Sequence, residues 1–200
     1  MNDVRMAGDH KILHAFEIGH KEFVIGEDKN ASPDERFLVA DYEYNGIFER
    51  YVNALVSSDY AEVSKIFAQR ISNEAERVIE EKSKIDFDIS PITKETCQEV
   101  TYKDSIKNKV IVLKLDIFKP EYQNATSQLQ LCTGGFGAEA NSRGSACFCT
   151  NLYSGKEHRY ERQDVIGIVD KEQLPQWAKD RLEEVQKERA EKKMADRGDR

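Results

Sequence analysis

The sequence predicts an α+β protein with two small antiparallel β-sheet units, each packed by one long helix. Two observations carry this prediction. Short apolar runs separated by turn residues recur on both sides of residue 90, and each series ends in one long segment with helical periodicity. A chain of 200 residues with 39% hydrophobic content can form one sizeable core or two small ones. The predicted units span residues 1–90 and 91–186, and a charged, frayed tail follows over 187–200.

The first unit opens with two predicted β-hairpins. Residues 11–18 and 22–25 flank Gly19-His20, where glycine permits a tight turn. Residues 37–42 and 47–56 flank Asn45-Gly46, whose tolerance of positive φ makes it the strongest short hairpin signal. We therefore expect four antiparallel strands.

A long helix is predicted after these strands. Asp59 and Glu62 have the spacing of a capping box, in which both side chains satisfy backbone amides of the first turn. Apolar residues then recur at helical spacing, and charged residues occupy the other side. The apolar stripe consists of Val63, Ile66, Phe67, Ile71, Ala75 and Val78. We expect this stripe to pack on the preceding sheet.

The second unit is predicted to contain five more strands and a helix. The candidate strands span 109–115, 128–132, 146–153, 157–162 and 165–169. Asp170 and Gln173 have capping-box spacing, and Pro175 suits a first helical turn. A buried stripe follows, made of Trp177, Ala178, Leu182 and Val185. Beyond residue 186 the stripe disappears, which predicts the frayed tail.

The net charge of −7 is concentrated in the N-terminal half, because residues 17–99 hold 19 acidic and 10 basic side chains. Such a surface repels nucleic acid and attracts basic partners, including proteins that themselves hold DNA or RNA. The alternative is that the acidity only confers solubility. No apolar run approaches the roughly 20 residues of a membrane span, and a secretory signal is not apparent, so we expect a cytoplasmic protein.

The cysteines leave two alternatives open. Cys147 and Cys149 share a strand face, and a two-residue turn at Ser154-Gly155 would bring His158 to that face, beside Asn151. With Cys132 nearby, these residues would form a zinc site with three cysteines and one histidine. The sequence favours buried reduced thiols instead, because the usual two-residue spacing of zinc cysteines is absent. We therefore predict no metal and no cofactor.

Catalytic motifs are also absent from the sequence. It contains no Gly-x-Ser-x-Gly elbow, no His-Glu-x-x-His pair and no Walker loop, which predicts a protein that is not an enzyme.

A glycine-rich segment, residues 133–145, is the best candidate for a functional surface. No helix-forming segment follows it, which disfavours a phosphate cradle. Phe136 and Arg143 offer an aromatic side chain and a planar cation suited to an interface. The alternative is a turn-rich connection in which Phe136 tucks back onto the sheet.

Several motifs resemble small proteins carried by phages and conjugative elements of gut Firmicutes. They are residues 18–27, 45–48, 133–137, 143–144, 149–153 and 174–178, within a likeness that covers most of residues 12–182. Some proteins of this kind are anti-CRISPRs that inhibit type II CRISPR-Cas effector nucleases. The resemblance implies a protein of the bacterial host cytoplasm that binds the guide-RNA-loaded nuclease and blocks it by protein-protein contact.

Charge and loop chemistry supply the candidate contacts for such a partner. They are Glu74, Glu76, Glu80 and Glu81 on the first helix, with Phe136 and Arg143 in the loop. Two other functions stay open: a nucleic-acid-processing or metal-binding accessory protein centred on Cys147, Cys149 and His158, and an adaptor without activity of its own. Homodimer formation is also left open.

Overall fold

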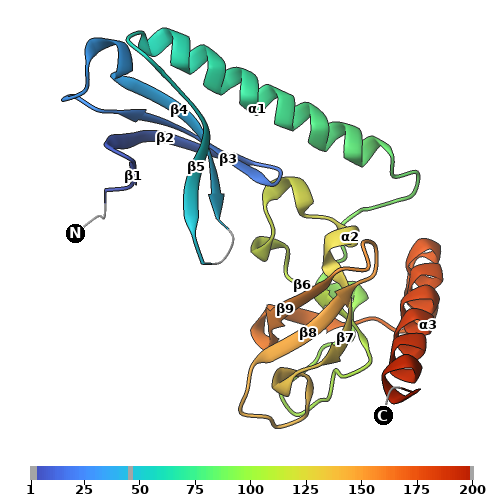
Figure 1. Ribbon diagram of the computed structural model, residues 1–200. Coiled ribbons are helices and arrows are strands. Elements are labelled where there is room, and N and C mark those ends of the chain that lie inside the picture. Colours follow the sequence, from blue (N-terminus) through green and yellow to red (C-terminus); the bar gives the residue numbers. More distant parts are fainter. Residues whose placement is uncertain (1–3, 45–46, 199–200) are drawn as a thin grey trace. The chain divides into compact units, whose positions relative to one another are not determined.

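The protein consists of two compact units, Met1–Asp86 (unit 1) and Phe87–Arg200 (unit 2) (Figure 1). The computed structural model describes residues 4–44 and 47–198, with side chains up to residue 191. Within these residues each unit holds a five-stranded antiparallel sheet and one long helix, so the α+β prediction is confirmed. The division falls a few residues before position 90, because Phe87 stacks on Trp177 of unit 2 with ring centroids 5.0 Å apart.

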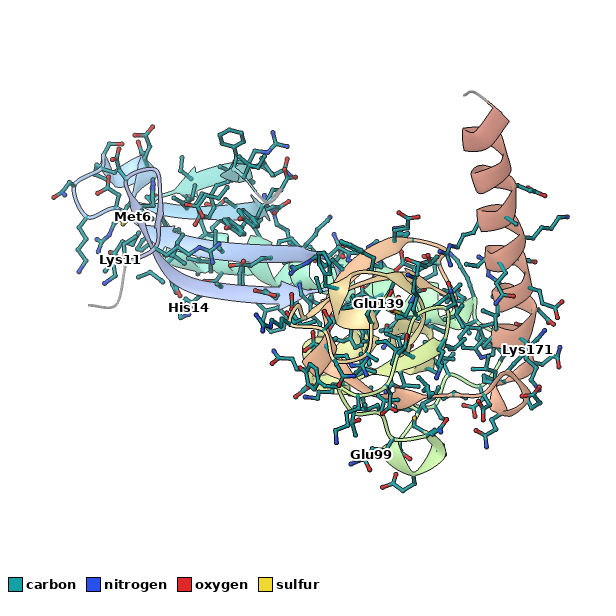
Figure 2. All side chains as sticks on the ribbon, turned by 90° about the horizontal axis from the view of Figure 1, so that it is seen from below. Met6, Lys11, His14, Glu99, Glu139 and Lys171 are labelled. Atoms are coloured by element: carbon teal, nitrogen blue, oxygen red, sulfur yellow. The ribbon has the colours of Figure 1, made fainter. Side chains whose placement is uncertain are left out.

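The sheet of unit 1 is a meander with the strand order β1-β2-β3-β4-β5. Its strands are β1 (Met6–Ala7), β2 (His10–Ile18), β3 (Lys21–Glu27), β4 (Phe37–Tyr44) and β5 (Glu49–Ser57). The predicted turn between β2 and β3 is confirmed, with Gly19 at φ 59°. Strand β1 has too few residues to show a periodic pattern, and it pairs Met6 with Lys11 (Figure 2). The second predicted turn, Asn45-Gly46, lies outside the described residues.

Helix α1 (Tyr60–Ser83) covers one face of this sheet (Figure 1). Its predicted cap is confirmed, because the Asp59 side chain accepts a hydrogen bond of 2.7 Å from the Ala61 amide. Glu62 accepts from the Ser57 hydroxyl instead of reaching back to the cap. Val63 of the predicted stripe is fully buried against Ile25 and Val39 of the sheet.

The opposite face of the unit 1 sheet is also partly covered. A second apolar cluster lies there: Ala7, Val24, Leu38 and Ala40. The Arg5 guanidinium lies over the Tyr42 ring at 4.0 Å from its centroid, and Arg5 Nε donates to Tyr51 Oη at 2.8 Å. Because both faces are covered, β3 and β4 contain continuous apolar runs rather than a strict alternation.

Unit 2 contains the sheet order β10-β6-β7-β8-β9. The strands are β6 (Val110–Leu113), β7 (Leu129–Gly134), β8 (Ala146–Asn151), β9 (Glu157–Glu161) and β10 (Val165–Ile168). All five predicted strands are therefore present. Between β6 and β7 lies the short helix α2 (Ala125–Gln128), which the Asn124 side chain caps by accepting from the Thr126 amide at 3.0 Å.

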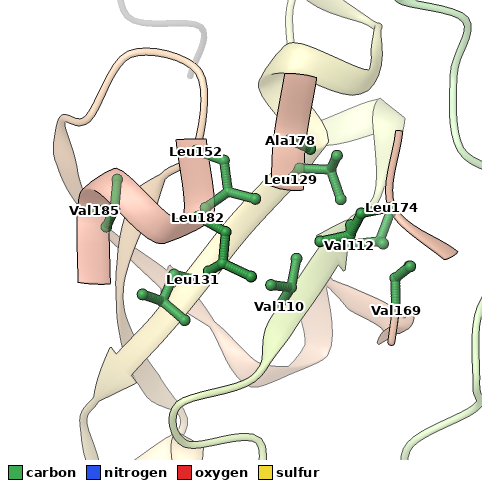
Figure 3. Close-up of a cluster of buried hydrophobic side chains, with 10 residues drawn as sticks. All are labelled: Val110, Val112, Leu129, Leu131, Leu152, Val169, Leu174, Ala178, Leu182 and Val185. Carbon is green, nitrogen blue, oxygen red and sulfur yellow. The ribbon is translucent and has the colours of Figure 1, made fainter. Parts of the chain in front are cut away.

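Two hydrophobic layers cover the faces of the unit 2 sheet. One layer lies between the sheet and α3 (Gln176–Gly198), and Figure 3 shows its members: Val110, Val112, Leu129, Leu131, Leu152, Val169, Leu174, Ala178, Leu182 and Val185. The other layer is formed with connecting segments and contains three cysteines together with Ile106, Ile111 and Leu113. The unit therefore buries both faces of its sheet.

Helix α3 continues to Gly198, well beyond residue 186, where its predicted buried stripe ends, and the fraying of 187–200 stays a prediction. The segment after Val185 is rich in Ala, Glu, Lys and Arg, which have high intrinsic helix propensity and need no buried stripe to extend an existing helix. The helix begins directly after Pro175, and Asp170 makes no capping hydrogen bond. No helix in the described part of the chain combines the length and hydrophobicity needed to cross a bilayer.

Candidate functional site

The loop between β7 and β8 is built around close backbone contacts. Gly135 has φ 93°, a left-handed conformation that side chains rarely adopt, and a Cβ there would overlap the carbonyl oxygen of Ala146. Gly137 is buried in the short 3-10 helix Phe136–Ala138, and a Cβ there would overlap the carbonyl oxygen of Ser145. The glycines are thus required so that the two sides of the loop can meet.

This loop exposes Phe136. Its side chain is 78% exposed, so the alternative in which Phe136 tucks back onto the sheet is wrong. Gly144 lies against it, because a Cβ on Gly144 would come within 2.6 Å of Phe136 Cβ. The neighbouring Arg143 is also exposed. Both residues predicted from this loop, Phe136 and Arg143, are therefore exposed.

A buried arginine anchors the base of the loop. Arg162 is 4% exposed and donates hydrogen bonds to the carbonyl oxygens of Gly137 at 3.3 Å, Thr101 at 2.6 Å and Asp104 at 3.0 Å. A single side chain thus joins the loop to a distant segment. The sequence did not single out Arg162, because a charged residue at the end of a strand is usually solvent-exposed.

Further contacts hold the outer part of the loop. The Asn141 amide donates to the Tyr102 carbonyl oxygen at 2.8 Å. Lys107 Nζ lies 2.7 Å from a carboxylate oxygen of Glu139, which is labelled in Figure 2. Together with the Arg162 anchor, these contacts hold Phe136 outward on a well-packed loop.

One of the predicted acidic contacts, Glu74, is not a surface residue. It is 3% exposed, and Arg77 Nε donates to it at 3.0 Å. The His20 amide is 3.4 Å from Glu74 Oε1, and a Cβ on Gly19 would overlap the same oxygen. The hydrogen bond from Arg77 holds the pKa of Glu74 below its ordinary value. Glu74 therefore fastens the β2–β3 turn to α1. Its prediction as a partner contact is wrong, because it is buried inside unit 1.

The other three acidic candidates remain exposed on α1: Glu76, Glu80 and Glu81. Two of them have cationic neighbours, since Lys84 Nζ is 3.3 Å from Glu80 and Arg77 pairs with Glu81. The net charge differs strongly between the two units. Residues 1–86 hold 18 acidic and 11 basic side chains, whereas residues 87–200 hold 19 of each. The whole net charge of −7 thus belongs to unit 1.

The cysteines pack inside unit 2. Cys132 lies opposite Cys149 on neighbouring strands, and Cys132, Cys147 and Cys149 are each at most 1% exposed. Cys149 in turn pairs with His158, whereas the predicted two-residue turn would have paired Asn151 with His158; the connection is longer than expected. His158 is exposed to solvent. The described residues hold no group of three or more His, Cys, Asp or Glu side chains arranged to bind a metal ion.

The environment of these thiols disfavours the thiolate form. A hydrogen bond with Cys132 and burial both raise the pKa of the Cys147 thiol. At Cys132 a hydrogen bond with Cys147 lowers the pKa, but a hydrogen bond with Cys149 and burial outweigh it and raise the pKa to about 12. Because thiolates are the metal-binding and nucleophilic form of cysteine, the cluster suits packing better than chemistry.

We expect one thiol, Cys97, to react before the other three in the native protein, although burial raises the pKa of Cys97 and slows its reaction. Cys97 is partly exposed, whereas the other three cysteines are buried. Titration with a thiol-reactive dye at pH 7.5 should label Cys97 first and the other three only after denaturation. A Cys97→Ser variant serves as the control and should show almost no native labelling. Rapid labelling of Cys147 or Cys149 in folded protein would contradict this assignment.

Comparison of the chain with protein-family models, with curated proteins and with solved structures finds no significant match.

Proposed function

We propose that the protein is a non-enzymatic inhibitor that binds a guide-RNA-loaded type II CRISPR-Cas effector nuclease through protein-protein contact. The observation that carries the proposal is the 78% exposure of Phe136 on a tightly packed loop. An aromatic side chain that is 78% exposed buries little apolar area within its own fold. It suits the anchor of an interface, where aromatic residues inserted into a partner's pocket dominate the binding energy.

The packing of the loop adds to this argument. Binding costs less when the contact residues are already ordered, because little conformational entropy is then lost. The loop is fastened by Arg162 and by close glycine contacts, so Phe136 is preorganised. Arg143 beside it supplies a fork of donors for a carboxylate or a backbone carbonyl of the partner.

The charge of unit 1 supports a basic partner. Nucleases of this class hold their guide heteroduplex and target DNA in positively charged channels, which an acidic protein can occupy or shield. The net charge of −7 on unit 1 would steer association with such a channel and repel free nucleic acid. Glu76, Glu80 and Glu81 are the exposed carboxylates that we assign to this contact.

A DNA-cleavage assay with purified nuclease and guide RNA tests the proposal. The wild-type protein in excess should suppress cutting, and Phe136→Ala should weaken inhibition at least tenfold, as expected for the loss of an interface anchor. Phe16→Ala is the matched control, because Phe16 is a half-exposed aromatic residue of unit 1. Undiminished cutting in the presence of excess protein would refute inhibition, and binding without inhibition would favour an adaptor.

Paired charge variants distinguish a direct contact at α1 from the overall electrostatic field of unit 1. Glu76→Gln with Glu80→Gln removes two negative charges from α1, and Asp34→Asn with Glu35→Gln removes two from another exposed part of unit 1. We expect the first pair to weaken binding more, and the difference to shrink as salt rises. Equal effects of the two pairs would contradict a contact on α1.

A further inference from the structure

Three buried cysteines gather under the loop between β7 and β8, and the proposed inhibitor function does not use them. Cys132 lies on β7, whereas Cys147 and Cys149 lie on the neighbouring strand β8, and all three belong to one hydrophobic cluster of unit 2 (Figure 1). Cys149 is directly opposite Cys132, and the Cys147 thiol shares a hydrogen bond with Cys132. Cys132 therefore has two neighbours with which it could form a covalent bond.

The backbone of Cys132 identifies Cys149 as the better placed partner. The Cys132 amide donates to the Lys109 carbonyl oxygen at 2.9 Å, and its own carbonyl oxygen accepts from the Asn108 amide at 2.7 Å. Both groups thus point away from β8, so Cys132 and Cys149 form a non-hydrogen-bonded pair. In such pairs the facing Cα atoms are about 4.5 Å apart and the side chains come closest. A disulfide spans Cα separations of about 4.4–6.8 Å, which include this one.

The backbone of β8 has the matching alternation. The Phe148 carbonyl oxygen points toward β7, where the Thr133 hydroxyl donates to it at 3.1 Å. Because successive residues of a strand turn their backbone groups to opposite sides, Cys149 turns its own toward β9, where His158 is its register partner. The two cysteines therefore direct their backbone groups to different strands and keep their side chains adjacent on one face of the sheet.

The cysteine cluster also touches both ends of the loop that carries Phe136. Cys132 Sγ lies 3.9 Å from the Gly134 carbonyl oxygen at the end of β7, and Cys147 Sγ lies 3.6 Å from the Ser145 carbonyl oxygen just before β8. A bond between the two strands at this point would enclose residues 133–148. It would therefore hold together the two strand ends from which the loop emerges.

We propose that Cys132 and Cys149 form a disulfide under oxidising conditions, and that this bond fastens the base of the Phe136 loop. The two thiols give up two electrons and two protons as the S–S bond forms, and a low-molecular-weight disulfide such as oxidised glutathione is thereby reduced to two thiols. The exchange passes through a mixed disulfide of one cysteine, which the other cysteine displaces. This inference goes beyond nuclease inhibition, and either can fail without the other.

The environment of the thiols determines how fast this exchange occurs. The raised pKa values of Cys132 and Cys147 leave little thiolate near neutral pH, so the reaction is slow in the folded protein. Local opening of unit 2, or folding in the presence of the oxidant, gives the reagent access. The extent of oxidation at equilibrium depends on the reduction potential and not on this rate. The test therefore includes refolding as well as native incubation.

Peptide mapping of the full chain tests the proposal. The protein is incubated with oxidised glutathione, both folded and during refolding from urea, and free thiols are then blocked with N-ethylmaleimide before digestion with trypsin. Arg143 provides a cleavage site between Cys132 and the two cysteines of β8, so a bond from Cys132 joins two peptides. We expect these joined peptides, with fragmentation that assigns Cys149, and their loss after dithiothreitol. Their absence after both treatments would overturn the proposal.

Matched variants identify the partner of Cys132. Cys147→Ala and Cys149→Ala make the same change two positions apart on one strand face. We expect the joined peptides to persist in Cys147→Ala and to be lost in Cys149→Ala. Cys97 packs against the other hydrophobic layer of unit 2, so Cys97→Ala should behave like the wild type. A wild-type yield of joined peptides from folded Cys149→Ala would refute the assignment.

Urea unfolding tests whether the bond fastens the loop. A cross-link restricts the unfolded chain, so the oxidised protein should show a higher urea midpoint than the reduced protein when unit 2 is followed by Trp177 fluorescence. Dithiothreitol should remove this difference. Equal midpoints for the oxidised and reduced forms would contradict a stabilising bond at the base of the loop.

Discussion

Gly137→Ala is expected to destabilise unit 2 by about 3 kcal/mol, at the upper end of the usual cost of overpacking. The added methyl group would overlap the carbonyl oxygen of Ser145 and lie 3.0 Å from the buried sulfur of Cys147. Neither neighbour can move away easily, because one is backbone and the other lies in the core. The backbone of Gly137 must shift instead, which also weakens its hydrogen bond with Arg162.

Gly134→Ala is the matched control for this variant. It makes the same chemical change three residues earlier, where a Cβ would meet no atom within 4 Å. Urea unfolding followed by fluorescence measures both variants, because the only tryptophan, Trp177, lies in unit 2. We expect a clear fall in the unfolding midpoint for Gly137→Ala and almost none for Gly134→Ala. Equal midpoints would show that the loop is not held by close backbone packing.

The two glycine variants also connect stability to the proposed function. If the inhibitor uses a preorganised Phe136, Gly137→Ala should weaken nuclease binding under conditions in which most of the protein is still folded. Gly134→Ala should bind like the wild type. A Gly137→Ala protein that is destabilised but binds normally would indicate that the order of the loop contributes little to recognition.

Local patterns were enough to predict most of the fold. The turn at Gly19 and the cap at Asp59 depend on residues close together in sequence, and both are confirmed. The placement of β10 beside β6 depends on pairing between residues far apart, which periodicity does not report. The N-terminal cover of the unit 1 sheet was missed for the same reason, since Arg5 reaches strands more than thirty residues away.

The residues of the candidate site could be predicted from the sequence only in part. Phe136 and Arg143 were identified from the loop alone, because glycines and an aromatic residue in a long connection are unusual. Glu74 was assigned to the acidic surface because a glutamate on a helix is normally exposed, yet the close approach of Gly19 buries it. Arg162 is not predicted, because its backbone partners come from two segments that lie far from it in the sequence.

Leu131→Ala is expected to destabilise unit 2 by about 2–5 kcal/mol, the usual range for leucine truncation in a core. Leu131 is 1% exposed and lies between the sheet and α3, among the side chains shown in Figure 3. The truncation removes buried apolar area and leaves a cavity between two rigid layers. The cost should fall toward the upper end of the range if neither the strand nor the helix can close the gap.

The fluorescence of Trp177 reports on the unfolding of unit 2, because this residue packs against the hydrophobic layer that contains Leu131. Leu131→Ala should therefore shift the fluorescence transition in urea to lower concentration. Val63→Ala truncates a fully buried residue in the separate core of unit 1, so it should leave the fluorescence transition in place and alter only the circular dichroism curve. A fluorescence shift of equal size in both variants would mean that the two cores unfold as one cooperative unit, against the separate cores that the packing indicates.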